Sequence, residues 1–313
     1  MQLKKHSGVQ SMGVLLLAMV LLLIVVFVIL VSKQRKEPDP GDVLDVDLPV
    51  IPATEEKIYE TTGEKIFLEN SPEGWLPVFA DVPACAYQNE KFVSRNDRVY
   101  YLEENQIISR FGIDVSYHQK EIDWQKVKAS GVEFAFIRVG RRGYTEGVLS
   151  EDEYFRQNIQ GARDAGIDIG VYFYSQAITP EEALEEAEMT LELLDGMALQ
   201  YPVVYDWEVI SDAEARTDDM TAETLTACCV TFCERIRQAG YIPMIYQNKR
   251  TSLLKLQLPE LTDYDFWLAE YNPEATYYYN YQIWQYASDG TVPGITGNVD
   301  LNICFKNYAE NLE

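Results

Sequence analysis

Two acidic residues, Asp206 and Glu208, close an apolar run of the sequence and could act together on a substrate. The run at positions 203–208 is typical of a buried strand, in which alternate side chains point the same way. Asp206 and Glu208 would then share one face. Two neighbouring carboxyl groups raise each other's pKa, which favours one that stays protonated near neutral pH. A protonated carboxyl group beside an ionised one suits acid-catalysed cleavage of a glycosidic bond.

Asp114 and Asp300 also interrupt apolar runs that are typical of strands. A charge inside such a strand costs on the order of several kcal/mol unless it is paired or has a function. Three strands that each carry an acid could bring all four carboxyl groups into one acidic cleft. Capping or ion-pair roles would explain Asp114 and Asp300 equally well, and solvated acids at a strand end would explain Asp206 and Glu208.

Aromatic residues gather near the ends of the same predicted strands. Sugar rings present apolar C–H faces that stack on aromatic rings, so such a rim suits a groove that binds a glycan. The residues are Tyr172, Tyr174, Tyr246, Trp267, Tyr271, Trp284 and Tyr286. Because most aromatic side chains belong to the core, we expect about half of these to contact a ligand. Trp207 alternates away from Asp206 and is expected to pack under the helices.

The elements that would position these residues begin near residue 110. Eight runs are typical of strands, at residues 111–116, 134–140, 167–175, 202–210, 241–246, 265–271, 281–286 and 298–305. Helical patterns fill most of the early gaps, at residues 124–130, 153–165, 180–194 and 221–239. Alternating strands and helices predict a parallel sheet, and eight strands predict a barrel whose last strands lack room for full helices between them. Asp206 and Glu208 would face inward near the carboxyl end of their strand, where barrel enzymes place their sites.

The amino-terminal part of the chain predicts a membrane anchor. Residues 14–31 form an unbroken apolar run without charge. At about 1.5 Å per residue, a helix of this length just crosses the hydrocarbon core of a bilayer. A cleaved signal peptide is the alternative, but the run ends at Val31 without the small residues of a cleavage site. We expect a single-pass helix at 14–31 that follows a short cytoplasmic segment at 1–13.

Two further segments separate this helix from the predicted barrel. Residues 32–56 are rich in Pro, Asp and Glu and lack periodicity, which predicts an extended linker. Residues 57–109 contain short alternating runs broken by turn-forming residues, which predict a small β-rich subdomain or stalk. The barrel would then occupy residues 110–313. Since basic residues flank the apolar run on both sides, charge does not fix the orientation of the helix.

Composition and charge limit the class of partner. The chain has 313 residues, of which 47% are hydrophobic, and a formal net charge of −24. Residues 1–36 contain five basic residues and no acidic one, so the remainder of the chain carries all of the negative charge. Such a domain repels phosphate backbones, and we expect no nucleic-acid partner. A neutral or cationic substrate is easier to accept.

Cysteine and histidine usage argues against several other chemistries. The five cysteines are an odd number, and three of them (Cys228, Cys229 and Cys233) fall in one predicted helix, where packing is the commoner role. The only histidines are His6 and His118, which excludes a His-rich zinc site. No GxSxG motif accompanies His118. We expect neither a metal nor a cofactor.

Five blocks of residues, in order and at matching spacing over about residues 110–305, resemble glycoside hydrolase family 25. This family contains the lysozymes of the Chalaropsis and phage-endolysin type. The blocks are Phe111-Gly112-Ile113-Asp114-Val115-Ser116, Asp206-Trp207-Glu208, Phe266-Trp267-Leu268-Ala269-Glu270-Tyr271, Ile283-Trp284-Gln285-Tyr286 and Val299-Asp300-Leu301-Asn302. The resemblance implies an irregular, TIM-like β/α barrel with about five β/α units followed by three strands.

The resemblance also implies an activity and a set of site residues. The activity is hydrolysis of the β-1,4 bond between N-acetylmuramic acid and N-acetylglucosamine in peptidoglycan, and we expect retention of configuration. Glu208 matches the catalytic acid/base, and Asp206 matches its partner, as nucleophile or by orienting the 2-acetamido group of the substrate. The positions expected to bind substrate are Asp114, Asp300, Tyr172, Tyr246, Trp267, Tyr271 and Gln285.

A wall substrate fixes the topology: we expect the amino terminus inside the cell and the catalytic domain outside, facing the wall. One departure from the family is Phe173, where many relatives carry His, which puts local substrate contacts in doubt. Two other functions remain open at this point. One is a non-catalytic wall-binding anchor, and the other is a different D-x-E glycosidase such as a chitinase-like enzyme. The sequence identifies no protein partner.

Overall fold

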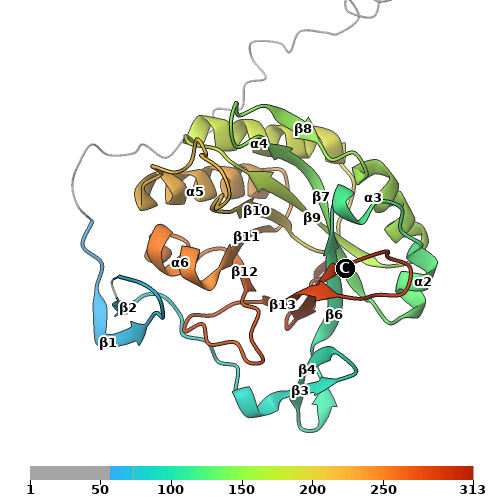
Figure 1. Ribbon diagram of the computed structural model, residues 1–313, viewed down its shortest axis with the longest axis horizontal. Coiled ribbons are helices and arrows are strands. Elements are labelled where there is room, and N and C mark those ends of the chain that lie inside the picture. Colours follow the sequence, from blue (N-terminus) through green and yellow to red (C-terminus); the bar gives the residue numbers. More distant parts are fainter. Residues whose placement is uncertain (1–56, 73, 313) are drawn as a thin grey trace, which may run out of the picture. The chain divides into compact units, whose positions relative to one another are not determined.

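The computed structural model describes residues 57–72 and 74–312 (Figure 1). Within these ranges no helix is long and apolar enough to cross a membrane. The predicted cytoplasmic segment at 1–13, the anchor at 14–31 and the linker at 32–56 lie outside the described residues.

The centre of the described chain is a closed barrel of eight strands, which confirms the predicted architecture. Pairing between the first two strands, β6 and β7, closes the sheet into a barrel, and β8 (Leu149–Glu151) only extends β7 at its side. The barrel strands are β6 (Arg110–Val115), β7 (Phe134–Arg142), β9 (Asp168–Ser175), β10 (Val203–Trp207), β11 (Pro243–Asn248), β12 (Asp265–Ala269), β13 (Ile283–Gly290) and β14 (Val299–Cys304).

Helices follow the first five barrel strands and lie outside them (Figure 1). They are α2 (Trp124–Ala129), α3 (Phe155–Asp164), α4 (Pro180–Leu194), α5 (Ala222–Gln238) and α6 (Lys249–Lys255). Short 3-10 turns accompany them as η1 (Asn89–Lys91), η2 (Tyr117–Gln119), η3 (Leu258–Glu260) and η4 (Ala309–Leu312). The cysteines of the chain are free, and the three on α5 are buried in its packing face, as the sequence predicted.

The sheet is not parallel throughout, so the TIM-like description holds only in part. β14 runs antiparallel to both of its neighbours, β13 and β6. The cause is the short connection at residues 291–298, because a parallel crossover needs a dozen or more residues and usually a helix. The chain therefore reverses directly from β13 into β14.

Alternation along each strand separates two apolar layers. On β10, Val203, Tyr205 and Trp207 face outward into the core under the helices, as expected for Trp207. Val204 points inward and joins a second cluster inside the barrel. This inner cluster fills the lower and middle levels of the barrel, where the Phe136 and Trp267 rings stack with centroids 4.5 Å apart. Towards the carboxyl ends of the strands the inward side chains become polar.

Residues 57–109 form two small sheets that pack on the barrel. One is a hairpin of β1 (Thr61–Phe67) and β2 (Trp75–Phe79), and the other contains β3 (Phe92–Arg95), β4 (Arg98–Glu103) and β5 (Gln106–Ile107). Ile66, Val78 and Val99 are buried in the same core as the barrel strands and helices. The Tyr279 hydroxyl accepts a hydrogen bond of 3.0 Å from the backbone N–H of Phe79. The hairpin is thereby fixed against the barrel.

Candidate active site

All four predicted acids line one pocket of about 310 Å³ at the carboxyl ends of the parallel strands. Asp114 is the penultimate residue of β6, Asp206 lies near the end of β10, and Glu208 follows that strand directly. Asp300 is near the start of β14, yet it lies directly opposite Asp114 in the sheet. The antiparallel direction of β14 is what brings its first residues to this end of the barrel.

Asp206 and Glu208 form the central carboxyl pair. Asp206 is buried, with only 4% of its surface exposed, while Glu208 is half-buried. Burial is the largest cause that raises the pKa of each, and the negative charge of Asp114 raises both further. A hydrogen bond between the two side chains raises the pKa of Asp206 and lowers that of Glu208. Both shifts favour a state in which the pair holds one proton.

One oxygen of this pair lacks a hydrogen-bond donor. Asp206 Oδ1 is buried and has no hydrogen-bond partner among the described residues. A buried acceptor without a donor is destabilising by about 1–3 kcal/mol. Such an atom in a pocket is suited to accept a hydrogen bond from a bound ligand.

Asp114 is held by a network of side-chain amides. Its Oδ2 accepts hydrogen bonds from Gln285 Nε2 and Asn302 Nδ2, both 2.8 Å long. Gln285 Oε1 in turn accepts from the hydroxyls of Tyr246 (2.8 Å) and Tyr271 (2.7 Å). Burial raises the pKa of Asp114 to about 6, although both amide hydrogen bonds oppose that rise. Gln285 therefore positions an acid and two aromatic rings at once.

Asp300 has a raised pKa, and burial is the main cause. Burial raises its pKa to about 9, with the charge of Asp114 as the second cause and that of Glu208 as a smaller one. At neutral pH Asp300 is therefore protonated, so the pocket carries fewer than four negative charges.

Five of the seven predicted aromatics line this pocket, namely Tyr172, Tyr174, Tyr246, Trp267 and Tyr271. The other two, Trp284 and Tyr286, do not. Gln285 points inward, so its two neighbours on β13 point outward, and both are buried in the core beneath. Since only about half of the seven were expected to contact a ligand, the absence of these two agrees with that expectation. Alternation along the strand decides which side chains reach the pocket.

The departure at Phe173 leaves the pocket unchanged. Phe173 lies between Tyr172 and Tyr174 on β9 and faces the opposite side of the strand. It is fully buried in the outer core. The doubt about substrate contacts at this position therefore does not apply.

Sequence reasoning missed several residues that line or hold the pocket. The missed lining residues are Val115, Ser116, His118, Gln119 and Arg138. Arg138 is buried and forms an ion pair of 2.8 Å with Asp152, and its positive charge lowers the pKa of Asp206. Its signal in the sequence was a charge inside the apolar run 134–140. Asn302, which holds Asp114, was visible only as part of a family block.

Two buried glutamines hold the backbone where β10 leaves the sheet. Gln247 Nε2 donates to the carbonyl of Trp207 (2.6 Å), and Gln176 Nε2 donates to the carbonyl of Glu208 (2.8 Å). Gln176 is itself fixed by the hydroxyl of Thr217, which donates to its Oε1 at 2.9 Å. These amides hold the backbone on either side of the pair and thereby fix the direction of the Glu208 side chain.

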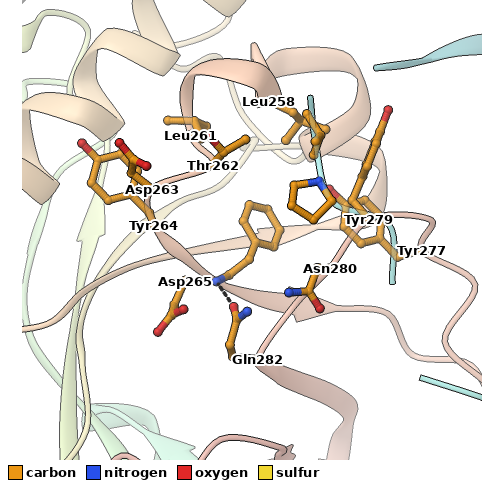
Figure 2. A pocket seen from close by; sticks show the side chains of 13 residues that line it. Leu258, Leu261, Thr262, Asp263, Tyr264, Asp265, Tyr277, Tyr279, Asn280 and Gln282 are labelled. Carbon is orange, nitrogen blue, oxygen red and sulfur yellow. Dashed lines mark hydrogen bonds between the residues drawn. The ribbon is translucent and has the colours of Figure 1, made fainter. Parts of the chain in front are cut away.

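A smaller cavity of about 140 Å³ lies at the other end of β12 and contains none of the predicted acids (Figure 2). It includes Asp265, the first residue of β12, whereas Tyr271 of the acidic pocket lies beyond the last. Gln282 Oε1 accepts a hydrogen bond of 2.7 Å from the backbone of Phe266 there (Figure 2). The Asp265 carboxylate already accepts one from the Tyr308 hydroxyl.

An eight-stranded α/β barrel with paired acids in an aromatic-lined pocket defines a glycoside hydrolase. The family model of glycosyl hydrolases family 25 matches residues 113–295. The chain belongs to this family.

Relatives and solved structures agree with this assignment. The autolytic lysozyme of Clostridium acetobutylicum is 29% identical over 205 residues, which are 61% of this chain and 54% of that protein. The protein YegX of Escherichia coli O157:H7 is 30% identical over 215 residues, 64% of this chain and 71% of that protein. This chain thus spans about half the length of the Clostridium lysozyme.

Two structures illustrate the shared fold. The modular autolysin LytC from Streptococcus pneumoniae is 25% identical with a TM-score of 0.55, and the match covers 77% of this chain and 57% of LytC. A family 25 glycosyl hydrolase from Bacillus anthracis is 20% identical with a TM-score of 0.53, covering 70% and 98% of the two chains. The second likeness concerns the fold alone.

Proposed function

We propose that this protein is a peptidoglycan hydrolase, an N-acetylmuramidase that cleaves the β-1,4 bond between N-acetylmuramic acid and N-acetylglucosamine. The observation that carries the proposal is the hydrogen-bonded pair of Asp206 and Glu208 in an aromatic-lined pocket. The relatives support the class of substrate: one is named an autolytic lysozyme, and LytC has been solved with a synthetic peptidoglycan ligand.

In the first step, Glu208 gives its proton to the glycosidic oxygen, and the bond between that oxygen and C1 of muramic acid breaks. The carbonyl oxygen of the sugar's own 2-acetamido group forms a bond to C1 from the opposite face. Asp206 is ionised at this point, because the shared proton has moved to Glu208. Its Oδ1, which lacks a partner, accepts the acetamido N–H and offsets the developing positive charge.

In the second step, Glu208 is ionised and acts as a base. It takes a proton from water while the water oxygen attacks C1 and displaces the acetamido oxygen. Two successive displacements at C1 give net retention. Two carboxyl groups that lie two residues apart at the end of one strand suit this route, because inversion goes with a wider separation of about 6.5–9.5 Å that holds a water molecule between the carboxyl groups.

Product analysis tests the proposal directly. The purified protein, incubated with cell walls, is expected to release fragments with muramic acid at the new reducing end and to form the retained anomer first. Glucosamine at the reducing end would indicate a chitinase-like or glucosaminidase activity. Binding to walls without any release of reducing ends would instead support the non-catalytic anchor.

Asp114→Asn is expected to move the alkaline limb of the pH profile of kcat/KM to lower pH by roughly one unit. The charge of Asp114 raises the pKa of both Asp206 and Glu208, so its removal lowers both. The pair then loses its shared proton at a lower pH, and the acid is lost with it. Asparagine keeps an oxygen for Gln285 and Asn302, so the pocket keeps its shape. A limb that stays in place or moves to higher pH would refute this role for Asp114.

We also propose that residues 14–31 anchor the protein in the cell membrane with the barrel outside, facing the wall. The apolar run supports this placement, and so does the nature of the proposed substrate, which lies outside the membrane. An external protease added to intact cells should release a fragment that begins before residue 111. Protection of that fragment until the cells are lysed would place the barrel inside the cell and contradict the proposed orientation.

A further inference from the structure

A second hollow, of about 560 Å³, lies beside the acidic pocket and has no role in the mechanism above. Its wall combines the end of β1 with the segments that follow β11 and β12. The lining residues include Phe67, Leu68, Asn248, Arg250, Glu270 and Asn272. The β1 residues lie outside the part of the chain that matches family 25, which begins at residue 113.

The second hollow opens at the same end of the barrel as the acidic pocket. Asn248 is the last residue of β11, and Ala269 is the last of β12. Glu270 and Asn272 line the second hollow, whereas Tyr271 between them lines the acidic pocket. The segment that follows β12 is thus shared by the two hollows, which lie on either side of it.

The hairpin presents an exposed pair of aromatic rings next to this hollow. Phe67 on β1 is 51% exposed and Trp75 on β2 is 59% exposed. Their ring centroids are 5.2 Å apart at an angle of 51°. Large apolar side chains left open to solvent in one patch mark an interaction site more often than scattered ones do. Flat rings beside polar groups suit the C–H face of a sugar.

The hairpin is held in a fixed position over the barrel. Arg250 NH1, at the start of α6, donates a hydrogen bond of 3.1 Å to the carbonyl of Asn70 in the hairpin turn. The Tyr278 hydroxyl donates one of 3.0 Å to Glu64 on β1. Val78 on β2 is almost fully buried in the common core. The aromatic pair therefore stands at a set distance from the catalytic acids.

The wall that faces the hairpin is polar and already ordered. Glu270 is buried and accepts hydrogen bonds from the backbone of Thr276 (2.7 Å) and from Asn272 Nδ2 (3.2 Å), and it pairs with Lys249 at 3.4 Å. Amide, ammonium and hydroxyl groups in fixed positions suit the hydroxyl and acetamido groups of a sugar. Their fixed geometry lowers the entropic cost of binding.

We propose that the β1–β2 hairpin and the second hollow form an added saccharide-binding subsite, which holds units of the same glycan strand next to those in the acidic pocket. The inference rests on the proposed function and deepens it. Sugar units stack on Phe67 and Trp75 while the polar wall around Glu270 binds their substituents. The protein therefore favours long glycan strands over short oligosaccharides.

The test compares long glycan strands with a muramyl tetrasaccharide as substrates of the full-length protein. The double variant Phe67→Ala/Trp75→Ala is expected to raise KM on long strands about tenfold and to leave kcat unchanged. Its kcat/KM on the tetrasaccharide should equal that of the wild type. Ile107→Ala is the matched control, because Ile107 is similarly exposed, at 53%, but lies on β5 away from the hairpin. Phe67→Tyr/Trp75→Phe should restore the wild-type KM.

The outcomes separate this inference from the proposed function. A wild-type protein that cleaves neither substrate refutes the muramidase assignment itself. If the wild-type protein cleaves both substrates and the double variant has the same KM on long strands, the added subsite is overturned. Equal losses on both substrates also overturn it, because the hairpin would then act only by supporting the barrel.

Discussion

Glu208→Gln is expected to lower turnover on cell walls by roughly 10³-fold while the affinity for the glycan stays within a few-fold of the wild type. Glutamine has nearly the same shape, so the backbone contact with Gln176 and the pocket survive. It cannot give a proton to the glycosidic oxygen, however, and it cannot later accept one from water. The loss therefore appears in kcat rather than in KM.

Clearing of a wall suspension measures the rate, and co-sedimentation with walls measures binding. Glu214→Gln is the control, because Glu214 is an exposed acid in the segment that follows Glu208. Clearing at the wild-type rate by Glu208→Gln would show that another group is the acid. A wild-type protein that binds walls but releases no reducing ends would instead support the wall-binding anchor.

Asp206→Asn is expected to reduce kcat by about 10²–10³-fold, close to the effect of losing one preorganised stabilising group. The neutral amide removes the negative charge that offsets the positive acetamido group. It also removes the proton that the pair shares at rest, so Glu208 must take its proton from solvent. Asp212→Asn, at an exposed position beyond the site, is the matched control and should retain full activity.

Mass spectrometry during turnover separates two roles for Asp206. With acetamido participation, no sugar becomes attached to the protein. A glycosyl ester on Asp206 would instead identify a direct nucleophile. In that case retention would persist but the acetamido route would be wrong.

Local patterns were sufficient to predict the eight barrel strands and four of the five helices that follow the first five strands. The run of inward and outward residues on β10 marks a strand covered on both faces, and Pro180 opens α4 with acids in the first turn. Gly166 follows α3 with φ at 71°, the left-handed conformation that ends many helices. Each of these signals depends on a few neighbouring residues, which is why it can be read without the fold.

Features set by distant contacts could not be predicted. The direction of β14 depends on which edge closes the barrel, and α6 has only seven residues, too few for a periodic pattern. The four acids were found because charges are rare in apolar strands. Gln285 was expected to bind substrate only from its place in a family block, and Asn302 was not singled out. Their contacts with Asp114 arise only when β13 and β14 lie beside β6.

The glutamines that hold the end of β10 have a consequence for how this protein responds to its surroundings. Gln176 and Gln247 fix the carbonyls of Glu208 and Trp207 with amide groups, which neither gain nor lose protons across the range in which cells live. These two side-chain amides therefore do not titrate, whereas the acids beside them do. Acidification therefore changes the protonation of Asp206 and Glu208 while the side-chain amide contacts to the end of β10 stay in their ordinary protonation state.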